Sequence, residues 1–224
     1  MTRLSVERQV TLARIINILA LVGLLGVLAG SLHLQLGVGE QPCPLCLVQR
    51  SGMIGLAVGP VMNLLWGMKA QHYAISILAA CAGAAGSVRQ IFLHVASPTD
   101  PGYGPEFFGF HLYTWAFVTF AVGVVGCAVL LFWNTPLVCG DQGISKQAGS
   151  LRAITYAVIT AVFLDLLVIT ITVIPECGLG MCPDDPANIS GFGDMGGWLF
   201  IAGLTVISLV VGFGLDRRKA RHSQ

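Results

Sequence analysis

The chain has 224 residues, of which 55% are hydrophobic and only 10% are charged, and its mean hydropathy is +0.79. An average soluble domain carries about 25% charged residues, so this composition excludes an ordinary soluble enzyme, a disordered chain and a nucleic-acid-binding protein. The 12 Lys and Arg residues nearly balance the 11 Asp and Glu residues, so the net charge alone indicates no partner. The composition is typical of an integral membrane protein in a lipid bilayer.

Six stretches are long and apolar enough to cross a membrane as helices. A bilayer core of about 30 Å requires roughly 20 apolar residues in a helix, and the sequence reaches this length at residues 15–36, 46–66, 73–95, 113–133, 153–174 and 198–215. The first stretch is too long for the apolar region of a signal peptide and lacks a small-residue cleavage site, so we expect a retained helix. The expected fold is an all-α membrane protein, a bundle of six transmembrane helices.

Basic residues predict the orientation of this bundle. With six spans, most Lys and Arg residues fall on one side of the membrane: Arg3, Arg8, Arg14, Lys69, Lys146, Arg152, Arg217, Arg218, Lys219 and Arg221. Cytoplasmic segments carry an excess of Lys and Arg, so we expect both termini to be cytoplasmic. All four tryptophans lie near predicted helix ends, as expected for indole rings at the headgroup level: Trp66, Trp115, Trp133 and Trp198.

Cys43 and Cys46 form a Cys-x-x-Cys pair at the outer end of the second predicted helix. Two cysteines at this spacing can close a small, readily reduced disulfide, and a helix N-terminus stabilises a thiolate. Arg50 lies one turn further along and adds to this effect, while Pro44 suits the first helical position. The pattern favours a reactive thiol pair. The alternatives are a structural disulfide and half of a zinc site, although no second Cys-x-x-Cys or His cluster supplies the other zinc ligands on this side.

Cys177 and Cys182 form a second pair in the outer connection between the fifth and sixth spans. Because Cys177 lies three residues after the fifth span and Cys43 three residues before the second, both pairs are expected near the same membrane surface. Thiol–disulfide exchange between them is therefore possible. The alternative is a permanent loop disulfide, which is common in an oxidising compartment.

The sequence around the first pair resembles the DsbB family of membrane disulfide-generating proteins. The resemblance rests on Cys43-Pro44-Leu45-Cys46 followed by Arg50, and extends to residues 100–104, 111–115 and the Cys-x4-Cys-Pro-Asp stretch at Cys177. It is strongest across the first four predicted helices. It implies a thiol oxidase of the bacterial inner membrane that reoxidises a periplasmic thioredoxin-like (DsbA-type) protein and passes the electrons to a quinone, either ubiquinone or menaquinone, without a metal.

The resemblance also implies roles for individual residues. Cys46 matches the cysteine beside the quinone, Cys43 matches its partner, and Arg50 matches the arginine that supports the quinone and the thiolate. The family's usual architecture is four helices, with the shuttle cysteines between helices three and four. Here the connection at 96–112 contains no cysteine, so a shuttle role for Cys177 and Cys182 is inferred from function and not from position.

Three units are therefore expected in the chain. Residues 1–133 form a DsbB-like four-helix core with the Cys-x-x-Cys pair, and residues 134–152 form a cytoplasmic loop. Residues 153–224 form an additional two-helix hairpin that carries the second cysteine pair and a basic tail.

Besides Arg50, the predicted spans contain Arg89, His94 and Asp165, and ionisable groups inside a membrane are costly and tend to be functional. Arg89 in the third span is expected near the quinone headgroup or in a structural ion pair, for which Asp165 in the fifth span is a possible partner. Asp165 is alternatively a group on a proton path. His94, near the outer end of the third span, either donates a hydrogen bond to a quinone carbonyl or contacts water.

Three other functions compete with the thiol oxidase. A six-helix reductant conduit would use the mid-membrane cysteines Cys81 and Cys127, which as buried residues are otherwise expected to act as apolar filling. A vitamin K epoxide reductase-like enzyme also joins a Cys-x-x-Cys to a second loop pair, but there the motif lies late in the bundle. The third possibility is a non-enzymatic membrane scaffold with static disulfides.

Overall fold

The computed structural model describes residues 5–96, 105–147, 149–178, 180, 182–183 and 187–222. Within this part of the chain, six helices are long and apolar enough to cross a membrane. They are α1 (Val6–His33), α2 (Pro44–Trp66), α3 (Ala70–Ala96), α4 (Leu112–Leu131), α6 (Gly149–Cys177) and α7 (Asp194–His222). The predicted all-α membrane bundle is therefore confirmed, and each predicted span coincides with one of these helices. Arg3 and residues 100–104, which the sequence singled out, lie outside the described residues.

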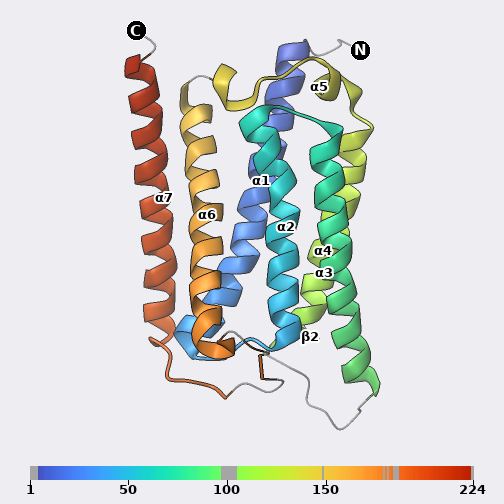
Figure 1. The fold of residues 1–224 in the computed structure, drawn as a ribbon, viewed down its shortest axis with the longest axis vertical. Coiled ribbons are helices and arrows are strands. Elements are labelled where there is room, and N and C mark those ends of the chain that lie inside the picture. Colours follow the sequence, from blue (N-terminus) through green and yellow to red (C-terminus); the bar gives the residue numbers. More distant parts are fainter. Residues whose placement is uncertain are drawn as a thin grey trace.

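The helices run alternately up and down, with α3 and α4 at one side of the bundle and α6 and α7 at the other (Figure 1). The end of the bundle at which α2 and α7 begin carries Cys43 and Cys177, and we call it the cysteine end. We call the opposite end, where α1 begins and α7 ends, the basic end.

Close packing of α2, α3 and α4 depends on glycine. Phe120 of α4 is fully buried, and its ring lies against Gly52 of α2 and Gly83 of α3. A Cβ atom added at Gly83 would come within 2.3 Å of this ring. Since a real Cβ cannot approach so closely, glycine is needed there for the three helices to meet around Phe120.

Two connections contain short elements that the sequence did not predict. Residues 134–152 were expected to form a loop, but they include the short helix α5 (Asn134–Val138) and the 3-10 helix η2 (Gly143–Lys146). These are held against α1 because buried Arg14 pairs with Asp141 and donates a hydrogen bond to the Gly143 carbonyl (3.2 Å).

The connection between α3 and α4, at the cysteine end, contains an antiparallel hairpin of β1 (Glu106–Phe107) and β2 (Phe110–His111). The Trp115 indole of α4 donates a hydrogen bond to the Phe107 carbonyl (2.8 Å) and thereby fixes the hairpin to its helix. The first span also runs further than α1, through one π-helical turn, η1 (Leu34–Val38).

Candidate redox site

Cys43 and Cys46 form a disulfide at the start of α2. Pro44 occupies the first helical position, as predicted, and Cys43 caps the helix because its Sγ accepts a hydrogen bond from the Cys46 backbone N–H (3.2 Å). Cys43 is only 5% exposed, whereas Cys46 is half-buried. Both sulfurs therefore lie at the positive end of the helix dipole, with Cys46 the more accessible of the two.

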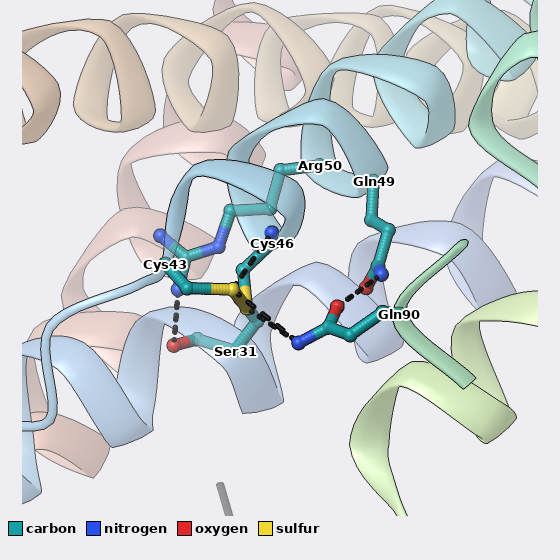
Figure 2. The surroundings of a disulfide bond; sticks show 6 residues. All are labelled: Ser31, Cys43, Cys46, Gln49, Arg50 and Gln90. Atoms are coloured by element: carbon teal, nitrogen blue, oxygen red, sulfur yellow. Dashed lines mark hydrogen bonds between the residues drawn. A yellow bond between two sulfur atoms is a disulfide. The ribbon is translucent and has the colours of Figure 1, made fainter. Parts of the chain in front are cut away.

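Gln90 of α3 was not identified from the sequence, but it is the polar side chain that faces both sulfurs. Its amide nitrogen lies 3.4 Å from the Cys43 sulfur and 3.8 Å from the Cys46 sulfur. Its amide oxygen accepts a hydrogen bond from buried Gln49 of α2 (2.7 Å), which fixes the orientation of the carboxamide (Figure 2). The only signal in the sequence is two glutamines inside otherwise apolar spans.

Arg50 lies one turn after Cys46, and its guanidinium is turned towards α1 (Figure 2). It is buried and donates hydrogen bonds to the Gln35 side chain (2.5 Å) and the Ser31 carbonyl (3.1 Å). It also interacts electrostatically with Asp165 of α6. Arg50 therefore joins α2 to α1 and η1 through hydrogen bonds and interacts with α6 through its charge. Its guanidinium is buried, so this positive charge is held in a largely dehydrated environment.

Arg89 and His94 occupy different faces of α3. Arg89 is exposed, and the ion pair with Asp165 that the sequence left open is not formed, since Asp165 interacts with Arg50. His94 lies one turn after Gln90 and therefore on the same helix face. It is half-buried, its Nδ1 has no hydrogen-bond partner among the described residues, and its ring meets that of His111 edge-on (4.9 Å between centroids).

Cys177, the last residue of α6, forms a second disulfide with Cys182 at the cysteine end. The residues that follow it are hydrogen-bonded to the segment that precedes the first disulfide. The Ile189 N–H donates to the Gly39 carbonyl (3.0 Å), and the Phe192 N–H donates to the Leu36 carbonyl (2.7 Å). The connection that carries Cys182 is therefore anchored four residues before Cys43.

The start of α7 is attached to the end of α1. The His33 ring stacks on Trp198 (4.3 Å between centroids), and its Nε2 lies 2.9 Å from the Asp194 carboxylate. These contacts place the second cysteine pair and the first at the same end of the bundle on a shared support.

Glu40 lies in the connection between η1 and α2, where partial burial raises its pKa above the usual range.

The other three cysteines, Cys81, Cys127 and Cys139, are not in disulfides. Cys81 is exposed on α3 and Cys127 is buried in α4, so the pair that a reductant conduit would need is not joined. Among the described residues, no cluster of three or more His, Cys, Asp or Glu side chains could hold a metal ion. The half-site for zinc at Cys43 and Cys46 therefore gains no further ligands within this part of the chain.

Comparison with known proteins gives a consistent family. Residues 13–103 match the family model described as "Disulfide bond formation protein DsbB". The chain is similar to "Disulfide bond formation protein B" of Verminephrobacter eiseniae (37% identical over 98 residues, 42% of this chain and 55% of that protein). It is also similar to the proteins of the same name from Acidovorax sp. (37%, 42% of this chain and 56% of that protein) and Burkholderia pseudomallei (34%, 46% and 59%).

The chain spans slightly more than half the length of these curated relatives. No solved structure matches it. The matching region contains α1 to α3, both cysteines of the first disulfide, Arg50 and Gln90, whereas α6, α7 and the second disulfide lie beyond it. The family resemblance expected at 111–115 and at Cys177 thus lies outside the family-model match. Residues 13–103 of the chain are therefore similar to the DsbB family of disulfide bond formation proteins.

Proposed function

We propose that this protein is a membrane thiol oxidase that reoxidises a periplasmic thioredoxin-like protein of the DsbA type and passes the electrons to a membrane quinone. The observation that carries the proposal is the Cys43–Cys46 disulfide at the start of α2, with a carboxamide against both sulfurs and a buried arginine one turn away. A hydrogen-bond donor, a helix N-terminus and a cation all favour a thiolate. This is the environment of a reactive cysteine pair.

The reaction is a relay of disulfide exchanges. The dithiol of the partner protein reduces Cys177–Cys182 and becomes a disulfide, and the resulting dithiol reduces Cys43–Cys46 in turn. At each exchange one S–S bond breaks and one forms, so two electrons and two protons move inward along the relay. The anchoring of residues 187–193 on the segment before Cys43 supports this order because it limits the distance that the second pair must travel.

A quinone fits the residues around Cys46. The His94 Nδ1 is buried and has no hydrogen-bond partner among the described residues, so as the N–H tautomer it can donate to a carbonyl oxygen. Arg50 supplies a positive charge and Cys46 the accessible sulfur. A quinone held there would supply the acceptor for the two electrons and two protons that the Cys43–Cys46 dithiol gives up as its disulfide re-forms. We also assign Arg89 to this site, as a cation at its margin on the exposed face of α3.

The orientation in the membrane follows from the same proposal. The cysteine end would face the periplasm, and the basic end, with both termini, the cytoplasm of a bacterium with an inner membrane. The distribution of Lys and Arg supports this orientation. The three units at 1–133, 134–152 and 153–224 would then be a redox core, a cytoplasmic connection and a hairpin that presents the shuttle pair.

The experiment is quinone reduction by the purified protein in detergent, driven by a reduced DsbA-type protein. The variants are Cys46→Ser and Cys177→Ser, with Cys81→Ala plus Cys127→Ala as the matched control. We expect turnover in the wild type and in the control, and none in either serine variant. If Cys177→Ser turns over and Cys46→Ser does not, the second pair is a static disulfide outside the relay. Turnover in Cys46→Ser would refute the proposed function.

A further inference from the structure

A cavity of about 350 Å³ is lined by residues of α1, α6 and α7. In Figure 1, α6 and α7 lie on the side of the bundle opposite to α3 and α4. Small residues create the cavity: Gly26 and Ala29 on α1 oppose Ala157 and Ala161 on α6. The volume lies in the range of sites that hold small ligands. Two of its three walls, α6 and α7, lie beyond the region that matches the DsbB family.

Asp165 of α6 is the one charged residue that lines this cavity. It is only 6% exposed, and its Oδ2 is buried with no hydrogen-bond partner among the described residues. The two hydroxyls that also line the cavity, Thr205 and Ser208, donate to backbone carbonyls one turn earlier on α7. A buried acceptor without a donor is costly, so the cavity presents one carboxylate oxygen without a donor beside an apolar wall.

The chemistry of this arrangement selects its ligand. The wall accommodates an apolar chain, and the Asp165 carboxylate in its ionised form accepts a hydrogen bond but has none to donate. A quinone carries only carbonyl acceptors and gains nothing from such a group. A quinol carries hydroxyl donors. We propose that the cavity binds the quinol, the reduced product, through a hydrogen bond from a quinol hydroxyl to Asp165. This inference rests on the proposed function, which supplies the quinol.

The test counts binding sites. A tritiated short-chain quinol is titrated under argon onto the purified protein, and unlabelled quinone or diacylglycerol, a lipid with a hydroxyl donor, is added as competitor. A Cβ atom at either Gly26 or Gly23 would meet no atom within 4 Å, but only Gly26 lines the cavity. Gly26→Leu therefore fills the cavity, and Gly23→Leu is its matched control on the same helix.

In the wild type and in Gly23→Leu we expect a site that binds quinol at least tenfold more tightly than quinone. Gly26→Leu should lose it. Asp165→Asn, whose carboxamide both donates and accepts, should bind the two forms within about threefold of each other, because a hydrogen bond to a charged group is lost. The inference would be overturned if both Gly26→Leu and Asp165→Asn bound quinol as the wild type does. Displacement of the quinol by an equal concentration of diacylglycerol would also overturn it, because the cavity would then be a general lipid site.

Failure of the inference and failure of the proposed function give different results. If the wild type reduces quinone but Gly26→Leu retains every quinol site, the thiol oxidase stands and the cavity assignment is wrong. If the wild type reduces no quinone but binds quinol in a site that Gly26→Leu abolishes, the cavity assignment stands and the thiol oxidase is wrong.

Discussion

Replacing Gln90 with leucine tests the electrostatics of the redox site directly. The Gln90 amide nitrogen faces both sulfurs of the first disulfide, at 3.4 and 3.8 Å. A donor in this position stabilises a thiolate more than it stabilises a neutral disulfide, so it favours the reduced form of the pair. Its removal should therefore make the reduction potential of Cys43–Cys46 more negative.

The magnitude follows from the energy of one hydrogen bond to a charged group, about 1.5–3 kcal/mol. For a two-electron couple, about 30 mV corresponds to 1.4 kcal/mol, so the full effect would be roughly 30–60 mV. Because both N···S distances are long for a strong hydrogen bond, we expect a shift near the lower end, about 30 mV. Equilibration with dithiothreitol buffers followed by thiol alkylation measures the potential of the pair.

A second variant separates this electrostatic effect from a loss of packing. Gln90→Leu leaves the Gln49 amide buried without its acceptor, which should cost about 1–3 kcal/mol of stability. Gln49→Leu combined with Gln90→Leu removes both partners and should recover much of the melting temperature but none of the potential. Ser87→Ala, on the same helix, removes a hydroxyl that donates to the Gly83 carbonyl (3.3 Å), and it is the control. A potential within about 10 mV of wild type in Gln90→Leu would refute the reasoning.

Three further predictions concern the supports of the site. Gly39 has φ +91°, and an added Cβ would lie 1.9 Å from the Ile189 carbonyl oxygen. Gly39→Ala should therefore release residues 187–193 and slow exchange between the two disulfides at least severalfold. Trapping of the mixed disulfide measures this rate, and an unchanged rate would contradict the anchoring role. Arg50→Met removes the donor to the Gln35 side chain and the Ser31 carbonyl and should lower stability by about 1–3 kcal/mol. Because Arg50 also attracts Asp165, the double variant Arg50→Met/Asp165→Asn should restore part of the melting temperature. Because burial raises the pKa of Glu40, ionisation of this carboxyl destabilises the folded protein. The stability associated with protonated Glu40 is therefore fully present below about pH 4.3, its pKa in the unfolded chain, and is lost as the pH rises through its higher pKa in the folded protein. Glu40→Gln should flatten the melting-temperature profile across that window, and an equally sloped profile would contradict the assignment to this residue.

The helices and the first disulfide could be predicted because their signals are local. Each span is a run of apolar residues of the required length, and Pro44 marks the start of α2 through its own geometry. The rotation of each helix is not local. A shift of one residue turns the side chain by about 100°, which is the difference between Arg89, exposed on α3, and Gln90, in contact with the sulfurs. No apolar periodicity in such a hydrophobic span indicates which of the two faces inward.

The anchoring of the second cysteine pair could not be predicted from the sequence for another reason. Its hydrogen bonds join backbone groups of Ile189 and Phe192 to those of Gly39 and Leu36, and backbone groups carry no residue-specific signal. Glycines were the available indication. Gly37 and Gly197 allow η1 and α7 to approach so closely that a Cβ at Gly197 would lie 2.8 Å from the Gly37 Cα.

The first helix contacts both α2, which begins at the first disulfide, and the α6–α7 pair, which carries the second. Its cysteine end carries Ser31 and, in η1, Gln35, both of which accept hydrogen bonds from Arg50 of the redox helix. It also carries His33, which holds the start of α7 through Asp194 and Trp198. Arg50 in turn interacts with Asp165 of α6. Through Asp165, α6 therefore contributes to the electrostatic environment of Arg50, one turn after Cys46, and it also carries Cys177 of the second disulfide.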